Sequence, residues 1–361
     1  MRILVWQWGR FGSGPRLATL LTEGLRSVPG ITAMLSLSSG AEILQSVAPP
    51  ACDLPVTTYQ GLFGFCKRMA GAQITVHALA RRIRHLSPDV AICVMPGPLD
   101  LLMARALRYL HVPFIVLVHE VDAHPGDHMP FRLFLQRALC RQAAAVGTLS
   151  THVGDRLRQE GLAGTPVRPL IHLRHPPMGF AVPPPRPWPK EGMRLLLFGR
   201  LRHYKGLDLL AEALALLGPR PALEVRVVGS GPESRALVSL RALPGVVVEN
   251  RWVPEDEVGA LLGWADTVVL PYREASQSGV AAAALAGGRR ILATNVGGLA
   301  EQLSGEQQAL VCQPDAVSLA AGLERLLKDR PGPVQTLGDP NFGWKEMAAT
   351  ICKTIEERLD L

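Results

Sequence analysis

The chain of 361 residues is predicted to fold as an α/β protein with two Rossmann-like domains, each built on a doubly wound parallel sheet. Its length exceeds that of an ordinary domain, which is about 100–200 residues. Short apolar stretches of strand type alternate with helix-favouring stretches, as in parallel sheets covered on both faces. Residues 181–193, AVPPPRPWPKEGM, hold five prolines and separate two such series, so they are the predicted linker.

The elements follow from apolar runs, which favour buried strands, and from runs of period 3.6, which favour helices. In residues 1–180 strands are expected near 2–7, 31–37, 90–95, 113–119 and 144–149, and helices near 14–28, 71–86, 99–110, 129–140 and 151–160. After the linker, strands are expected near 194–199, 223–229, 246–249, 267–271, 290–294 and 309–311, with helices between them. Because doubly wound sheets bind ligands outside the carboxyl ends of their strands, functional residues are expected in the turns there.

Composition excludes several classes of protein. The longest apolar runs, such as FIVLV at 114–118, are far shorter than a membrane span of about 20 residues. The N-terminal MRILVW begins as a buried strand and lacks the pattern of a secretory signal, so a cytoplasmic protein is expected. The six cysteines are scattered without metal-binding spacing and are expected to be reduced thiols of the core.

The net charge of +7 is concentrated in the first half, where residues 1–180 hold 18 Lys and Arg against 10 Asp and Glu. This asymmetry favours an acidic partner, such as an anionic membrane face or a phosphorylated acceptor. The basic stretch 65–86, FCKRMAGAQITVHALARRIRHL, has the composition of a membrane-surface helix, and an ordinary solvated helix face is the alternative. No aromatic residues interleave the basic cluster as a stacking platform for nucleic acid would require, so no nucleic-acid partner is expected.

The turn after the first strand is rich in glycine, with Gly12, Ser13 and Gly14 directly before a helix that Pro15 could open. Glycine lets another molecule approach the backbone closely. The order of the glycines matches neither a dinucleotide fingerprint nor a Walker loop. A ligand-binding turn and a tight structural turn both stay open.

The segment HEVDAHPGDH at 119–128 gathers histidines and carboxylates just after a predicted strand. The zinc pattern H-E-x-x-H fails, because the second histidine follows the first by five residues and a helix would turn the two side chains about 140° apart. A metal site formed by the loop is the alternative. We favour His119 as a residue that faces the ligand and bonds a sugar hydroxyl or stabilises a transition state, with Asp122 and His124 shaping the loop.

Two turns of the second half are predicted to bind phosphate. In GRLRHYKG, Arg200 and Lys205 bracket a turn between a strand and a helix, and each could give a diphosphate a charge-assisted hydrogen bond. In REASQSGVAAAALAGG, Ser278 can cap the next helix, and the amides of Gly279 and Val280 can donate to a phosphate. A plain helix cap is the alternative for the second turn. With NVGGLAE at 295–301, the turns could converge on one ligand.

These motifs resemble those of the retaining GT-B glycosyltransferases, closest to glycosyltransferase family 4. The resemblance rests on the early glycine turn, the histidine at a strand end, GRLRHYKGLDLLAEAL, VVGSGPE, VPEDEVGALLGWADTVVLPY, SGV and TNVGGLAE. It implies an acceptor-binding domain at 1–180, a donor-binding domain at 194–340, a cleft between them, and a terminal helix at 341–361 that packs back on the first domain.

The resemblance also assigns roles to residues. It implies catalytic roles for His119, Arg200 and Lys205, with the two cations on the donor diphosphate, and an acceptor or cleft position for Asp122 and His124. The implied donor-binding residues are Gly12, Ser13, Gly14, Gly199, Gly229, Gly231, Glu274, Ser276, Gln277, Ser278, Gly279 and Val280. No metal or other cofactor is implied, because the positive groups stabilise the departing diphosphate.

One feature departs from the family pattern, which has two glutamates eight positions apart around the phosphate-binding helix. Aligned through Gly279, they fall at or near Ser276 and at Ala283 or Ala284, and neither position is acidic here.

The predicted function is transfer of a hexose, with retention, from a nucleoside diphosphate sugar to an acceptor hydroxyl in bacterial surface glycan synthesis. Peripheral contact with the inner membrane face is expected. A catalytically silent nucleotide-binding scaffold and a nucleotide-sugar epimerase are the alternatives.

Overall fold

The computed structural model describes residues 1–122, 130–180, 192–220, 222–329 and 341–358. The chain forms two compact units. Among the described residues, the N-terminal unit holds 1–122, 130–176 and 341–358, and the C-terminal unit holds 177–180, 192–220 and 222–329. The predicted linker lies outside the described residues, except for Gly192 and Met193.

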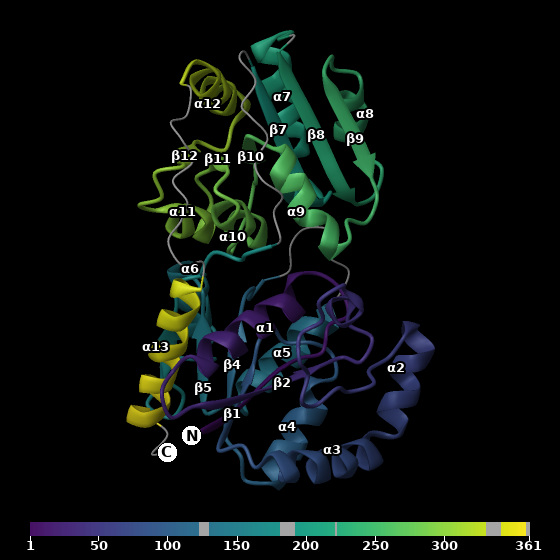
Figure 1. The fold of residues 1–361 in the computed structure, drawn as a ribbon, viewed down its shortest axis with the longest axis vertical. Coiled ribbons are helices and arrows are strands. Elements are labelled where there is room, and N and C mark those ends of the chain that lie inside the picture. The colour runs from purple at the N-terminus through teal and green to yellow at the C-terminus, as the bar shows by residue number, and fades with distance from the viewer. Residues whose placement is uncertain (123–129, 181–191, 221, 330–340, 359–361) are drawn as a thin grey trace. The chain divides into compact units, whose positions relative to one another are not determined.

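The N-terminal unit is a six-stranded parallel sheet in the order β2-β1-β3-β4-β5-β6. Figure 1 labels four of these strands, β1, β2, β4 and β5. Its strands are β1 (Arg2–Gln7), β2 (Thr32–Leu37), β3 (Val90–Cys93), β4 (Phe114–Val118), β5 (Ala145–Thr148) and β6 (Leu170–His172). Its helices are α1 (Ser13–Arg26), α2 (Gly61–Ala70), α3 (Ala72–Leu86), α4 (Asp100–Tyr109), α5 (Pro130–Cys140), α6 (Thr151–Gln159) and α13 (Phe342–Arg358), with a 3₁₀ turn, η1, at Glu42–Gln45.

The C-terminal unit repeats this plan with the strand order β12-β11-β10-β7-β8-β9, again all parallel. Its strands are β7 (Met193–Arg200), β8 (Leu223–Ser230), β9 (Val246–Asn250), β10 (Thr267–Leu270), β11 (Arg290–Thr294) and β12 (Ala309–Cys312). Its helices are α7 (Leu207–Leu217), α8 (Arg235–Arg241), α9 (Glu255–Trp264), α10 (Gly279–Ala286), α11 (Gly297–Leu303) and α12 (Ala316–Lys328), with a 3₁₀ turn, η2, at His203–Lys205.

Each sheet has a hydrophobic core on both faces. Along β1, Leu4 and Trp6 pack into one cluster while Ile3 and Val5 pack into another. Alternate residues of β7 divide in the same way between two clusters of the C-terminal unit. Because successive side chains of a strand point to opposite faces, such strands must be apolar throughout. The predicted α/β class with two doubly wound parallel sheets is confirmed.

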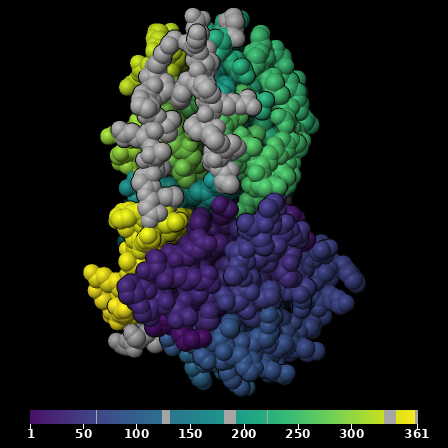
Figure 2. Space-filling model, viewed as in Figure 1, coloured from purple at the N-terminus to yellow at the C-terminus, as the bar shows by residue number. Residues whose placement is uncertain are grey.

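The terminal helix α13 packs against α1 in the N-terminal unit (Figure 2). A Cβ on Gly24 of α1 would lie 2.6 Å from the carbonyl oxygen of Trp344, so glycine is what lets the two helices approach closely. The Trp344 side chain is buried in the core under this contact. The last described helix therefore completes one face of the first sheet.

Several local features differ from the predictions. Strand β6 was not predicted, because three residues are too few to show a periodic pattern. The basic stretch 65–86 is not one helix, since it is divided at Gly71 between α2 and α3. The prediction that all cysteines belong to the core is wrong for Cys66, which is exposed. Among the described residues, no helix has both the length and the apolar character needed to span a bilayer.

Candidate functional site

The first predicted phosphate turn follows β7 and is held against the end of β10. Gly199 has a φ of +115° and Gly206 a φ of +67°, conformations that favour glycine. A Cβ on Gly206 would lie 1.6 Å from the carbonyl oxygen of Pro271. The amide of Arg273 donates to the carbonyl oxygen of Tyr204 (2.8 Å). These contacts fix the turn that carries the two predicted cations.

The second turn leads into α10 and presents the start of that helix. The Ser278 hydroxyl caps α10 by accepting from the Ala281 amide (3.2 Å). The first amides of a helix have no partner within it, so those of Gly279 and Val280 are the donors that α10 can offer to an anion. The predicted cap at Ser278 is therefore present, and it leaves two amides of the first turn for a ligand.

A buried glutamine holds the second turn from behind. The Gln302 side chain of α11, only 4% exposed, accepts from the Ser278 amide (2.8 Å) and donates to the Ser278 carbonyl oxygen (3.0 Å). Both ends of one side-chain amide are thus used on a single residue. This pairing fixes the backbone at the start of α10, which is the position that a phosphate-binding turn needs.

Two buried tyrosines connect the cations of the first turn with the second turn. The Lys205 ammonium lies 3.6 Å from the centre of the Tyr272 ring, and the Arg200 guanidinium lies 5.7 Å from that of Tyr204. The Tyr272 hydroxyl in turn lies 3.3 Å from the Ser278 hydroxyl. Burial raises the pKa of Tyr272, so its hydroxyl stays protonated and the ring supports the cation without adding charge.

Two more contacts join the turns of the C-terminal unit. A methyl carbon of Val280 lies 3.5 Å from the point where a Cβ of Gly199 would stand, so the end of β7 meets the start of α10. The turn before α11 also packs here, because the Gly298 amide donates to the carbonyl oxygen of Ala275 (2.9 Å). The structure therefore brings the three strand-end turns together at one edge of the second sheet.

The glycines of VVGSGPE allow the ends of β7 and β8 to pack closely. A Cβ on Gly229 would lie 1.7 Å from the carbonyl oxygen of Gly199, and a Cβ on Gly231 would lie 1.9 Å from that of Leu201. Side chains at these two positions would separate the ends of β7 and β8. Their predicted place beneath a nucleoside stays a prediction.

The positions expected to bind the donor sugar and ribose differ in exposure. Glu274 is exposed, and Ser276 and Gln277 are half-buried. Ala283 and Ala284, the positions at which the resemblance predicts the second glutamate of the family pattern, are both buried in the core. A carboxylate there would lose its hydration, so an alanine suits the packing of α10 as it stands.

In the N-terminal unit, His119 follows β4 and is buried at 4% exposure. Burial, with a smaller contribution from His175, lowers the pKa of His119 to about 3. His175 is also buried, donates from Nδ1 to the Pro176 carbonyl oxygen (2.8 Å), and lies with its ring 6.5 Å from that of Trp344. The imidazole of His119 is therefore neutral at pH 7 and can form hydrogen bonds without carrying charge.

The acidic residues after β4 are paired with arginines. Asp122 accepts two hydrogen bonds from Arg156 of α6 (2.9 and 3.0 Å), and Arg156 lowers the pKa of this carboxyl. Glu120 accepts one from Arg132 of α5 (3.0 Å). Across the described parts of the chain, no cluster of three or more potential metal ligands occurs. Asp122 has a structural partner that the sequence did not indicate, and His124 lies outside the described residues.

The glycine turn after β1 is shaped by a buried glutamine. A Cβ on Gly14 would lie 2.7 Å from the Gln7 amide nitrogen, and Gln7 also accepts from the Gly9 amide (2.9 Å). Gly12 stands before α1 with a φ of +84°, and no side chain caps the helix there. The tight structural turn is therefore real, and the uncapped amides at Ser13 and beyond keep the ligand-binding alternative available.

Sequence reasoning missed the residues that support the site from behind. Gln302, Tyr204, Tyr272 and His175 all lie outside the predicted set, and all are buried. Only the position of Tyr272 at the end of a predicted strand gave a signal. Gln302 acts through a contact between α11 and the start of α10, which no local pattern encodes.

Two family models match this chain. The model described as "Glycosyl transferase 4-like domain" matches residues 31–171, and the model described as "Glycosyl transferases group 1" matches residues 192–329. A glycogen synthase of Mycobacterium tuberculosis is 30% identical over 62% of this chain and 56% of that protein, so the chain matches about half the length of that relative. The 2-deoxystreptamine glucosyltransferase of Streptomyces kanamyceticus is 27% identical over 76% of each chain.

Solved structures share the whole fold. A sucrose-phosphate synthase of Thermosynechococcus elongatus is 18% identical, with a TM-score of 0.68 over 99% of both chains. The Anabaena protein HepE, solved in complex with UDP-glucose, is 16% identical, with a TM-score of 0.64 over 100% of this chain and 99% of that one. The chain therefore joins a glycosyl transferase 4-like domain to a glycosyl transferases group 1 domain, in the architecture of the GT-B glycosyltransferases.

Proposed function

We propose that this protein transfers a hexose from a nucleoside diphosphate sugar to an acceptor hydroxyl, with retention of configuration. One observation carries the proposal. In the C-terminal unit, Arg200, Lys205 and the first amides of α10 are gathered at one edge of the sheet, supported by Tyr204 and Tyr272. Two cations beside a helix start form a site for a diphosphate.

In the proposed reaction these groups stabilise the charge that develops at the transition state. The bond between the sugar carbon and the diphosphate oxygen breaks while the acceptor oxygen bonds to that carbon, and the proton of the acceptor hydroxyl passes to the departing diphosphate oxygen. Negative charge develops on the diphosphate. Each cation can give a charge-assisted hydrogen bond of about 1.5–3 kcal/mol, against about 0.3–1 kcal/mol for a helix dipole alone. We therefore assign most of the phosphate affinity to Arg200 and Lys205, and we propose that no metal ion is needed.

His119 has a different task. Its pKa of about 3 keeps the ring neutral at physiological pH. A neutral imidazole can donate a hydrogen bond to a sugar hydroxyl or accept one from it, but it supplies no positive charge to the leaving group. We propose that His119 orients the transferred sugar.

Similar proteins favour a sugar nucleotide as the donor. HepE was solved with UDP-glucose, and a relative acts as a glucosyltransferase by its name. The basic N-terminal half favours an acceptor with acidic groups or one at an anionic membrane. We propose a lipid-linked or growing surface glycan as the acceptor, met by a cytoplasmic protein at the inner membrane face.

The test begins with the purified full chain and a panel of UDP-, GDP- and ADP-sugars, with product anomers assigned by NMR. We expect turnover with one donor class, an axial or equatorial product matching the donor, and no loss on chelation by EDTA. Arg200→Ala and Lys205→Ala should each weaken nucleoside diphosphate binding about 10- to 150-fold. Arg202→Ala, in the same turn, is the matched control. Unchanged affinity in both variants, with no turnover from any donor, would refute the proposal.

A silent nucleotide-binding scaffold is the second candidate, favoured by the buried alanines at 283 and 284. Turnover separates the two. His119→Ala should abolish transfer by an enzyme, whereas it should leave the nucleotide affinity of a scaffold unchanged. An epimerase is distinguished by mass balance, because it would convert the donor sugar without any acceptor.

A further inference from the structure

We propose that a groove on the N-terminal unit, between α2, α4 and α5, binds one acyl chain of an anionic phospholipid at a membrane surface. The inference deepens the membrane location proposed above by naming the site and its ligand. It concerns residues that lie outside the candidate diphosphate site. The binding assay requires neither donor nor turnover, so the two proposals can fail separately.

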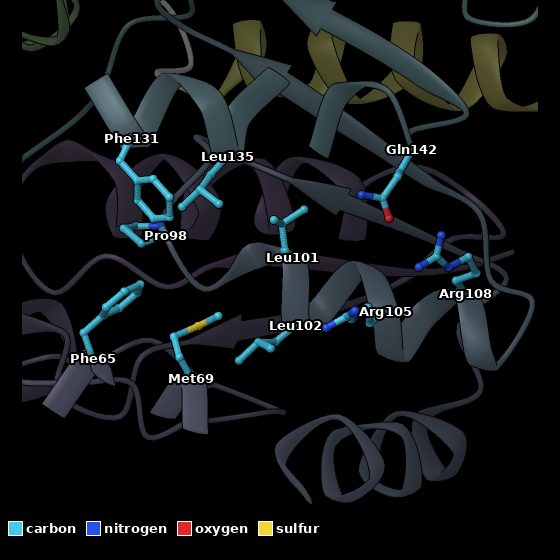
Figure 3. A pocket seen from close by; sticks show the side chains of 10 residues that line it. All are labelled: Phe65, Met69, Pro98, Leu101, Leu102, Arg105, Arg108, Phe131, Leu135 and Gln142. Atoms are coloured by element: carbon cyan, nitrogen blue, oxygen red, sulfur yellow. The ribbon is translucent and has the colours of Figure 1, made fainter. Parts of the chain in front are cut away.

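The groove is apolar over most of its length. It has a volume of about 300 Å³, at the lower end of the range for small-molecule sites, which is about 300–1,000 Å³. Helix α2 contributes Phe65 and Met69, and the other apolar walls come from Pro98, Leu101, Phe131 and Leu135 (Figure 3). A volume of this size suits part of one hydrocarbon chain.

The other end of the groove is cationic. Arg105 and Arg108 of α4 lie there with Gln142, apart from the phenylalanine side chains (Figure 3). None of the lining residues is acidic. A guanidinium binds phosphate oxygens by two parallel hydrogen bonds, so this end suits a phosphate group. A groove with one apolar end and one cationic end matches an anionic amphiphile.

Between residues 61 and 110, all of which the structure describes, no acidic group is left to neutralise these cations. Residues 61–110 hold seven Lys and Arg but only two Asp and Glu. Of the two, Asp89 accepts from the Arg2 amide (2.7 Å). Asp100 is buried and accepts from the Gly97 amide (2.6 Å). The excess positive charge therefore faces outward and attracts an anionic surface.

The helices around the groove also expose aromatic side chains. Phe63 of α2 is 84% exposed, and Phe131 and Phe134 of α5 are 56% and 60% exposed with their rings stacked 6.3 Å apart. Exposed aromatic residues beside uncompensated arginines are the composition of a membrane-interface surface. A protein partner for such a groove would need an acidic face, whereas an anionic bilayer supplies the chain and the phosphate together.

The test measures co-flotation of the full chain with vesicles. Vesicles of phosphatidylcholine alone should bind weakly, and vesicles that include phosphatidylglycerol should bind well. Removing both groove arginines, by Arg105→Gln with Arg108→Gln, should lower partition to the anionic vesicles about 30-fold. The matched control removes two exposed arginines of α3, by Arg81→Gln with Arg84→Gln, and should change partition less than about threefold if the groove is the site.

A second variant tests the chain pocket without changing charge. Leu101→Trp fills the groove and should lower partition at least about tenfold, the effect of withdrawing two methylene groups from hydrocarbon. Val238→Trp, on an exposed surface of α8, is its control. Melting temperatures check that all variants fold. Failure to bind the anionic vesicles, equal losses in the two arginine pairs, or unchanged partition in Leu101→Trp would overturn the proposal. So would self-association that Leu101→Trp abolishes, because a second copy would then fill the groove.

Discussion

Replacement of Gln302 by methionine tests whether the hydrogen bonds from Gln302 to Ser278 fix the backbone at the start of α10. The side chain is 4% exposed and makes two hydrogen bonds to one residue, at 2.8 Å from the Ser278 amide and at 3.0 Å to its carbonyl oxygen. Methionine has a similar length and cannot make either bond. The Ser278 amide would then stay buried without a partner, whereas the Ser278 carbonyl oxygen would keep the hydrogen bond that it accepts from the Ala282 amide (3.1 Å).

The magnitude follows from the one buried amide that loses its partner. A buried donor left unsatisfied costs about 1–3 kcal/mol, so the variant should lose about 2 kcal/mol of unfolding free energy. For a domain of this size, that loss lowers the melting temperature by about 4–8 °C. Because the same contact positions the amides of Gly279 and Val280, affinity for a nucleoside diphosphate should fall as well.

The assay is thermal unfolding followed by calorimetric titration with UDP and GDP well below the melting temperature. Gln308→Met is the matched control, because Gln308 makes a single longer bond to the Leu285 carbonyl oxygen (3.3 Å) at the other end of α10. It should melt within about 2 °C of the parent and bind nucleotide equally well. If Gln302→Met melted within about 1 °C of the parent, or lost stability with no change in affinity, the inferred support of the phosphate turn would be wrong.

Three further predictions concern stability. Gly206→Ala should destabilise the C-terminal unit and weaken nucleotide binding, because φ is +67° and a Cβ would lie 1.6 Å from a carbonyl oxygen; calorimetry checks both effects. Asp266→Ala removes the buried carboxylate that accepts from the amide and the guanidinium of Arg194 and should cost about 3–5 kcal/mol by urea unfolding, whereas a loss below about 1 kcal/mol would contradict this. Burial lowers the pKa of His119 to about 3 and that of His175 to about 4, so below pH 6.5 the unfolded chain binds more protons and stability should fall toward pH 4. Measurements of the unfolding free energy at several pH values check the direction of this change. His175→Gln should make the unfolding free energy depend less on pH.

Most of the fold could be predicted from local patterns. The predicted strand near 2–7 has the bounds of β1, and the strand near 290–294 those of β11, because both are continuous apolar runs beside turn signals. Strand β6 was missed because its three residues carry no period. The helix expected near 71–86 agrees with α3, whereas α2 was not predicted.

The site could be predicted only where its residues follow strands directly. Arg200 ends β7 and Ser278 precedes α10, and each stands beside a glycine, so their places at the sheet edge were open to prediction. The ion pair of Asp122 with Arg156 joins residues 34 positions apart, and no spacing rule indicates it. The buried face of α10 likewise could not be foreseen, because a run of alanines suits a core helix and a surface helix alike.

The sequence by itself determined the two parallel sheets, the order of their elements and the turns that carry the predicted phosphate ligands. It could do so because alternating apolar runs and glycines act over a few neighbouring residues. The tertiary structure decided which groups support those turns. Only the folded sheet brings Gln302 to Ser278, stacks Lys205 on Tyr272 and leaves a groove with arginines at one end, because these contacts join elements distant in sequence.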